Sequence, residues 1–133
     1  MIVVDTNVIV YALIEGDKTA LAESVATKDP NWVVPPLWRH EFLNVLVTCI
    51  RGGVIDVRQA ESLWHTALGL LVRAEREVDG GAVLDLAAEH KISAYDAQYI
   101  ALARRLETQC ITEDRRLART FPETAISMAS FCR

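Results

Sequence analysis

The chain has 133 residues, a formal net charge of −4 at pH 7, and a composition that is 51% hydrophobic and 24% charged. This length favours a single domain over residues 1–133, and the composition excludes a disordered or low-complexity protein. The acidic balance argues against a protein that coats nucleic acid through bulk electrostatics.

The first residues contain no basic region followed by a long apolar stretch and a cleavage site, and no apolar run reaches the length of a membrane span. Cys49, Cys110 and Cys132 are widely spaced, odd in number and lack zinc-site spacing, so free thiols in a reducing compartment are expected. We therefore expect a cytoplasmic protein that does not enter a membrane.

A short strand is predicted over residues 2–4, where three apolar residues end directly on Asp5. Open α/β sheets bind ligands at the carboxyl ends of their strands, so Asp5, followed by Thr6 and Asn7, marks a candidate site. A capping turn after a core strand is the alternative explanation for the same three residues.

The rest of the chain alternates helices with short strands. Further strands are predicted at residues 32–34, 109–112 and 125–129. Helices are predicted at residues 8–13, 19–26, 37–50, 56–71, 79–90 and 93–106, and a short one follows residue 113. This alternation without a hairpin signal predicts an α/β fold, a three-layer α/β/α sandwich around a short, mostly parallel sheet.

Two of the predicted helices place an acid on the side that their apolar spacing turns inward. Glu41 lies three residues after Trp38 and four before Val45, and Asp96 lies three residues before Tyr99. Neither apolar stripe contains Lys or Arg. Burying an ionised carboxylate without a partner costs several kcal/mol, so both positions require an explanation.

Asp114 follows the strand predicted at residues 109–112, so that four acids follow strand ends or lie in helices that begin nearby. Two carboxylates about 4 Å apart repel by roughly 4 kcal/mol at an effective dielectric constant of about 20. A cluster must therefore take up protons or bind a cation, and oxygen ligands without His or thiolate select Mg²⁺ or Mn²⁺. Ordinary burial is the alternative for Glu41, and helix capping is the alternative for Asp96 and Asp114.

The acids and their neighbours resemble the PIN-domain ribonucleases, especially the VapC-type toxins of toxin–antitoxin pairs. The matching segments are Asp5-Thr6-Asn7, Glu41, Ser93-Ala94-Tyr95-Asp96-Ala97 and Thr112-Glu113-Asp114-Arg115-Arg116-Leu117, which span nearly the whole chain in the family's order. The resemblance implies a PIN-like domain with a Mg²⁺- or Mn²⁺-dependent endoribonuclease site.

The same resemblance assigns the residues of that site. It implies that Asp5, Glu41, Asp96 and Asp114 are catalytic and bind the metal, and that Thr6, Asn7 and Thr112 are accessory polar residues. The family's Thr-any-Asp pattern selects Asp114 over the competing Glu113. The expected partners are an RNA substrate, a small antitoxin protein and a second copy in a homodimer.

Several alternatives stay open. Arg115 and Arg116 are candidate contacts to RNA phosphates, or a solvated basic turn. Either Glu41 or Asp96 could take the proton of the attacking water. A catalytically silent PIN-fold module that binds or processes RNA is the first rival function. A Mg²⁺-dependent phosphatase or phosphotransfer domain is the second, although a haloacid-dehalogenase-type enzyme has an acid two residues after the first, where this chain has Asn7.

Overall fold

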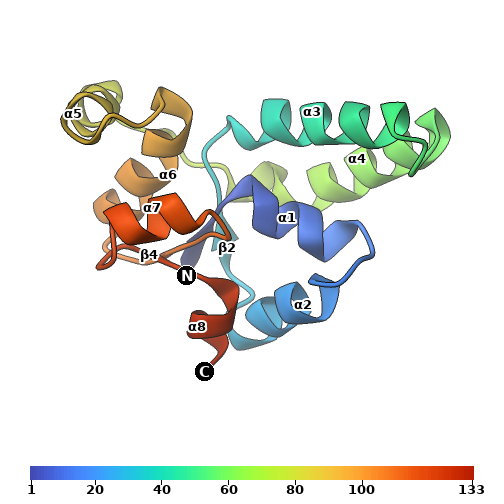
Figure 1. Cartoon of the computed structure of the whole chain (residues 1–133), viewed down its shortest axis with the longest axis horizontal. Helices are drawn as coiled ribbons and strands as arrows, with labels where there is room; N and C mark the ends of the chain where they lie inside the picture. Colours follow the sequence, from blue (N-terminus) through green and yellow to red (C-terminus); the bar gives the residue numbers. More distant parts are fainter.

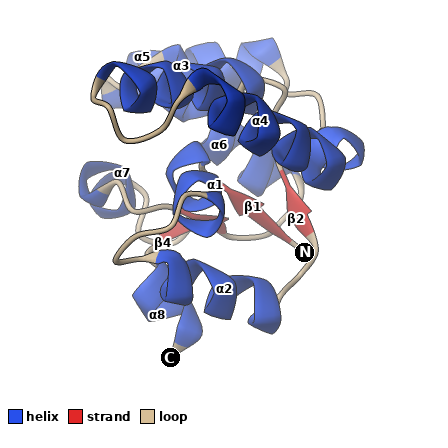
Figure 2. Cartoon of the chain, turned by 90° about the vertical axis from the view of Figure 1, so that its right-hand side faces the viewer, coloured by secondary structure: helices blue, strands red, loops and turns tan.

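The computed structural model describes residues 1–133 and contains one four-stranded sheet with helices packed on both faces (Figures 1 and 2). The strands are β1 (Ile2–Val4), β2 (Trp32–Val33), β3 (Cys110–Ile111) and β4 (Ala125–Ile126). They lie in the order β2-β1-β3-β4, and every neighbouring pair is parallel. The prediction of an α/β fold with a short parallel sheet is therefore confirmed.

The helices connect these strands and form the outer layers. They are α1 (Thr6–Leu13), α2 (Thr19–Lys28), α3 (Trp38–Arg51), α4 (Val57–Leu71), α5 (Gly80–His90), α6 (Ala94–Arg105), α7 (Arg115–Thr120) and α8 (Met128–Cys132), with a short 3₁₀ turn η1 (Val72–Ala74). None of them combines the length and the apolar composition that crossing a membrane requires.

Side-chain alternation along β1 divides the hydrophobic core into two layers. Ile2 and Val4 join the cluster built by α1, α2, α3, α4 and α8, whereas Val3 joins the cluster built by α5, α6 and α7. Because successive side chains of a strand point to opposite faces, a three-residue strand that is buried on both faces must be apolar throughout. The Ile-Val-Val sequence of β1 meets this requirement, and all three residues are buried.

The helix starts follow the capping residues in the sequence. A capping box begins α4 at the predicted start, because Asp56 Oδ1 accepts from the Gln59 amide at 2.8 Å and Gln59 Oε1 accepts from the Asp56 amide at 2.9 Å. Helix α1 begins at Thr6, two residues earlier than predicted, because the Asp5 carboxylate caps it and accepts from the Thr6 amide at 2.7 Å. Asp5 is thus both the residue directly after β1 and the N-cap of α1.

The predicted strand at residues 125–129 is wrong in its second half. Strand β4 stops at Ile126, and Ser127 begins α8 by accepting from the Ser130 amide at 3.1 Å. Met128, which the sequence prediction places in the strand, is a fully buried residue of this helix. A run of five residues with apolar members fits either structure by periodicity, and the cap at Ser127 decides for the helix.

The parallel sheet brings two polar segments to the same edge. The Asp5 amide, directly after β1, donates to the Ile111 carbonyl of β3 at 2.9 Å, so Asp5 and the β3–α7 loop emerge side by side. Since parallel strands end at a common edge, the residues that follow β1 and β3 face one another there.

Candidate active site

A polar cleft of about 320 Å³ lies at this edge of the sheet. Its lining comes from the end of β1, the start of α1, helix α3, the first turn of α6 and the β3–α7 loop. The lining residues are Asp5, Thr6, Asn7, Glu41, Asn44, Val45, Asp96 and Asp114. The four acids singled out in the sequence therefore meet in one cleft, although 109 positions separate the first from the last.

Asp5 is the most buried of these acids, with 8% of its surface exposed. Its Oδ2 accepts from the Thr112 hydroxyl at 2.7 Å and from the Asn7 side-chain amide at 3.3 Å. Burial raises the pKa of Asp5 to about 7, and the negative charge of Glu41 adds to the increase, although the Thr112 and Thr6 hydrogen bonds oppose it. The carboxylate is thus held by neutral donors alone.

Glu41 is held by two hydroxyl groups. Its Oε1 lies 2.9 Å from Thr6 Oγ1 and 2.6 Å from the Tyr99 hydroxyl, and these two hydroxyl oxygens are themselves 2.6 Å apart. Each hydroxyl has one hydrogen, so two of the three contacts are hydrogen-bonded at any moment. Burial raises the pKa of Tyr99 far above its usual range, so this phenol remains a donor.

Asp96 and Asp114 each lie at the start of a helix. The Asp96 amide donates to the Ser93 hydroxyl at 3.0 Å, and Asp96 lines the cleft from the first turn of α6. The Asp114 carboxylate caps α7 by accepting from the Leu117 amide at 3.1 Å. Capping is therefore a real role of Asp114, and it uses one of the two carboxylate oxygens.

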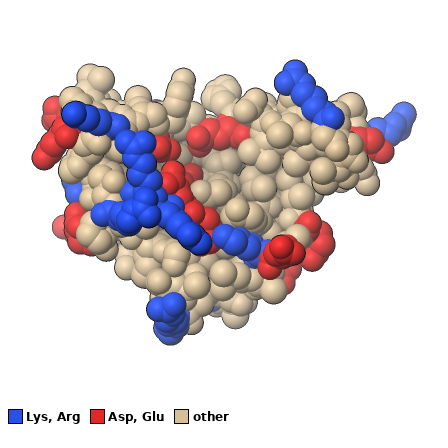
Figure 3. Space-filling view, in the orientation of Figure 1, with Lys and Arg blue, Asp and Glu red and all other residues tan.

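The cleft acids have no basic partner. The chain's ion pairs involve five other acids: Asp29, Glu75, Glu89, Glu113 and Glu123. The pKa of Asp96 is raised by burial and by the charges of Asp114 and Glu41, and the Ser93 hydrogen bond and the Arg116 guanidinium offset this only in part. Figure 3 shows acidic side chains inside the hollow and basic side chains gathered along one side of it, over α7. The cleft is therefore a concentration of negative charge that no ion pair of the chain neutralises.

The donor set suits a hard divalent cation. Carboxylate, hydroxyl and amide oxygens are the ligands that Mg²⁺ and Mn²⁺ prefer, and the cleft contains no His or Cys side chain. No three His, Cys, Asp or Glu side chains are arranged as a closed metal-ligand cluster, so the acids line a cleft rather than converge on one point. An open arrangement of this kind is compatible with a cation that keeps several of its waters.

Two residues that contact this site were missed in the sequence. Tyr99 was assigned to the apolar stripe of α6, and its ring is indeed buried, but its hydroxyl reaches Glu41. Asn44 lines the cleft one turn after Glu41 on α3. The spacing of three residues in both cases, Asp96 to Tyr99 and Glu41 to Asn44, was the signal that both lie on the same side of a helix as an acid.

The structure also separates Glu113 from its neighbours in the β3–α7 loop. Glu113 does not line the cleft and pairs instead with Lys18 at 2.8 Å, whereas Asp114 on its carboxyl side does line the cleft. Arg115 and Arg116 are exposed on α7 beside the cleft, and Arg116 also donates to the Lys91 carbonyl at 3.3 Å.

Comparison with known proteins identifies relatives of the whole chain. Residues 2–121 match the PIN domain family. The chain is 30% identical over 125 residues to Ribonuclease VapC3 of Pyrobaculum aerophilum, and the match covers 91% of this chain and 95% of that protein.

Solved structures agree in fold. The crystal structure of PAE2754 from Pyrobaculum aerophilum matches with a TM-score of 0.77 at 22% identity, covering 98% of this chain and 92% of that one. A toxin–antitoxin complex from Klebsiella pneumoniae matches with a TM-score of 0.70 at 17% identity, covering 96% and 98% of the two chains. The crystal structure of FitAcB from Neisseria gonorrhoeae matches with a TM-score of 0.72 at 15% identity, covering 97% of this chain and 99% of that one. Together with the match over residues 2–121, these findings show that the chain belongs to the PIN-domain family.

Proposed function

We propose that this protein is a Mg²⁺- or Mn²⁺-dependent endoribonuclease whose active site is the acidic cleft. The observation that carries the proposal is the meeting of Asp5, Glu41, Asp96 and Asp114 in one cleft without any ion pair. The similarity to a protein named a ribonuclease, at 30% identity over most of both chains, supports RNA as the substrate.

The four acids are the residues that would hold the cation. Bound Mg²⁺ or Mn²⁺ supplies Lewis-acid chemistry, which activates water and offsets negative charge on the phosphate. In the hydrolysis a water oxygen forms a bond to phosphorus while the bond from phosphorus to the 3′ oxygen breaks, and the 3′ oxygen leaves with the bonding electron pair and takes a proton from solvent. Glu41 and Asp96 are the candidates to take the proton of that water, because each presents a carboxylate that no Lys or Arg neutralises.

The other polar residues of the cleft orient the acids. Thr112 and Asn7 direct donors at one oxygen of Asp5, and the hydroxyls of Thr6 and Tyr99 direct donors at one oxygen of Glu41. The other oxygen of Asp5 accepts from the Thr6 amide at 2.7 Å, so both Asp5 oxygens are oriented, whereas only one oxygen of Glu41 is used in this way. Such fixed orientation matters because a small displacement of a catalytic group lowers the rate strongly.

Arg115 and Arg116 are the proposed contacts to RNA phosphates. Both are exposed on α7, on the side of the cleft where Figure 3 shows basic side chains. Phosphates bound at these guanidinium groups would position a strand next to the acids without reading its bases.

The toxin role in a toxin–antitoxin pair is a further part of the proposal. It is supported by the similarity to Ribonuclease VapC3 and by the fold shared with a toxin–antitoxin complex. The expected partners are a small antitoxin protein that covers the cleft and a second copy in a homodimer. Co-expression with the protein encoded immediately upstream should relieve growth arrest if that protein is the antitoxin, and light scattering of the purified chain should report a dimer.

The test of the nuclease function is cleavage of a structured RNA by the purified chain with Mg²⁺ or Mn²⁺. Asp5→Asn and Asp114→Asn should each lower the rate at least about a hundredfold, the usual scale for losing one such catalytic group. Glu123→Gln is a matched control, because Glu123 is an exposed acid outside the cleft. An Arg115→Ala/Arg116→Ala variant should bind RNA more weakly. The slope of the logarithm of the binding constant against the logarithm of the salt concentration should fall in magnitude by about 0.7 per lost phosphate contact.

The assay also separates the rival functions. Cleavage that survives EDTA, or that Asp5→Asn shares equally, would indicate a contaminant and leave a silent RNA-binding module. Release of inorganic phosphate from phosphomonoesters without RNA cleavage would instead favour the phosphatase alternative.

A further inference from the structure

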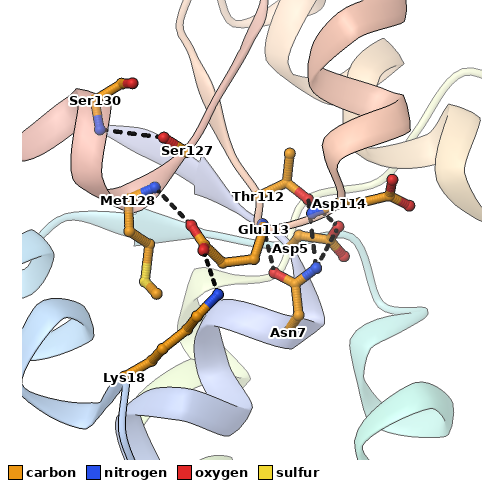
Figure 4. A network of polar contacts seen from close by, with 9 residues as sticks. All are labelled: Asp5, Asn7, Lys18, Thr112, Glu113, Asp114, Ser127, Met128 and Ser130. Carbon is orange, nitrogen blue, oxygen red and sulfur yellow. Dashed lines mark hydrogen bonds and ion pairs between the residues drawn. The ribbon is translucent and has the colours of Figure 1, made fainter.

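Glu113 lies between two residues of the site but turns its side chain away from the cleft. Figure 4 shows the Glu113 side chain directed at Lys18 and Met128, while Asp5 and Asp114 lie on the other side of the β3–α7 loop. Glu113 Oε2 pairs with Lys18 Nζ at 2.8 Å, and Glu113 Oε1 accepts from the Met128 amide at 2.8 Å. The Glu113 side chain is only 14% exposed.

These two contacts fasten the loop to segments that are distant in sequence. Lys18 lies in the turn between α1 and α2, where its ammonium group also approaches the Tyr11 ring at 5.2 Å. Met128 is the first residue of α8, and its side chain is fully buried in the core. The loop that contains Thr112 and Asp114 is thus joined at one point to the α1–α2 turn and to α8.

The backbone of Glu113 connects this junction to the cleft. Its amide donates to Asn7 Oδ1 at 3.2 Å. Because a backbone amide only donates, Asn7 must present its oxygen there and its NH₂ group on the other side, toward Asp5 Oδ2 at 3.3 Å and Thr112 Oγ1 at 3.4 Å. The position of the Glu113 peptide therefore determines how Asn7 meets Asp5.

The strength of the pair itself does not explain the arrangement. Lys18 is 44% exposed, and ion pairs with an exposed member contribute little to stability. A carboxylate that joins three segments beside a site instead restricts the geometry of that site, as the hydrogen-bond partners of metal ligands commonly do.

We propose that Glu113 is a positioning residue, which through Lys18 and the first turn of α8 sets the β3–α7 loop so that Asn7, Thr112 and Asp114 are held for cation binding. This inference rests on the proposed divalent-cation site and adds to it a residue that touches neither cation nor RNA. The competing explanation is that Glu113 is itself a ligand of the cation.

The test is calorimetric titration of the metal-free full-length chain with Mn²⁺. Glu113→Gln and Lys18→Met should each weaken Mn²⁺ binding about tenfold, the lower end of the range for residues that support metal ligands. Lys18→Met keeps an aliphatic side chain for the Tyr11 contact and removes the charge. The double variant should bind Mn²⁺ about as tightly as either single variant, because both changes break the same interaction. Lys18→Arg should restore affinity to within about twofold of wild type, since it restores the pair.

Glu123→Gln is the matched control, since it removes a surface acid whose Arg104 partner lies at 3.1 Å, and it should leave Mn²⁺ affinity unchanged. A lower melting temperature with unchanged Mn²⁺ affinity in Glu113→Gln would reduce Glu113 to a structural role and overturn the proposal. Loss of binding in Glu113→Gln with none in Lys18→Met would identify Glu113 as a ligand and overturn it as well.

The outcome is separable from that of the nuclease test. Absence of RNA cleavage by wild type, together with the expected order of Mn²⁺ affinities, would refute the proposed function and support the role of Glu113. Cleavage by wild type with equal Mn²⁺ affinities in all variants would support the proposed function and refute the role of Glu113. Wild type that binds no Mn²⁺ would refute both.

Discussion

Asp5 in the cleft and Glu75 after η1 are both carboxylates with little exposure, yet their pKa values move in opposite directions. Burial raises the pKa of Asp5 to about 7, because its partners are neutral hydroxyl and amide groups and its charged neighbours, Glu41 and Asp96, are both acids. Burial acts on Glu75 in the same sense, but the Arg39 guanidinium at 2.5 Å and the Trp38 indole at 2.9 Å outweigh it and lower the pKa.

The comparison shows what separates a structural acid from a candidate functional one. Glu75 joins the start of α3 to η1. Its charge needs no partner from outside the chain, because Arg39 pairs with it. The acids of the cleft are also held by hydrogen bonds, as Glu75 is, but no basic side chain pairs with their charge. Such an arrangement lowers stability unless protons or a cation compensate for it, and functional sites often show this imbalance.

The largest expected effect comes from removing the charge of Asp5. A rise of its pKa from 3.8 to about 7 means that the folded state binds a proton more readily than the unfolded state, so stability is present below about pH 4 and is lost as pH rises to about 7. In metal-free buffer, the unfolding free energy of Asp5→Asn relative to wild type should therefore increase by about 4 kcal/mol between pH 4 and pH 8.

Denaturant unfolding of both proteins between pH 4 and pH 8 measures this difference. It should grow across the window and level off above about pH 7. If the difference in unfolding free energy between Asp5→Asn and wild type did not change with pH, the fold would not destabilise the ionised form of Asp5.

The next effect is stabilisation by a cation. If Mn²⁺ binds only the folded chain, a free concentration one hundred times the dissociation constant should add about 2.7 kcal/mol to the unfolding free energy. Thermal unfolding at pH 7.5 with and without Mn²⁺ measures the gain as a higher melting temperature. The gain should disappear in Asp5→Asn and persist in Glu75→Gln. Equal gains in both variants would place the bound cation away from the cleft.

The smallest effect is expected at Glu75, with the opposite sign. Glu75→Gln should lower the melting temperature by roughly 2–4 °C at pH 7, because its charge is matched in the folded chain. The pKa of Glu75 is lowered from 4.5, so this loss should be complete above about pH 4.5 and vanish as pH falls below the folded value. A rise in melting temperature at pH 7 would remove the contrast with Asp5.

Much of the fold was predictable because its signals are local. The apolar run before Asp5, the capping box at Asp56 and the caps at Ser93 and Asp114 each depend on residues within four positions, and the structure confirms the strand and the helices that they indicate. The prediction is wrong at residues 125–129, where a short apolar run is compatible with two periodicities and the Ser127 cap decides for the helix.

The candidate site was predictable in its members but not in its contacts. The sequence identified Asp5, Glu41, Asp96 and Asp114 from their places after strands and on helix faces, and the structure brings them into one cleft. The spacing from Asp96 indicates that Tyr99 shares a helix side with an acid, but not that its hydroxyl reaches Glu41, because an aromatic residue on an apolar stripe is ordinarily a core residue.

The sequence by itself determined which segments fold and where their acids lie along them, because helix caps, strand length and apolar spacing act over a few residues. Only the tertiary structure decided which acids share a cleft and which are neutralised. Glu113 and Asp114 are adjacent in sequence, yet Lys18, some 95 positions away, pairs with the first and leaves the second facing the cleft. The reason is physical: the charge balance of a carboxylate depends on neighbours that chain folding brings close, and sequence distance does not reveal them.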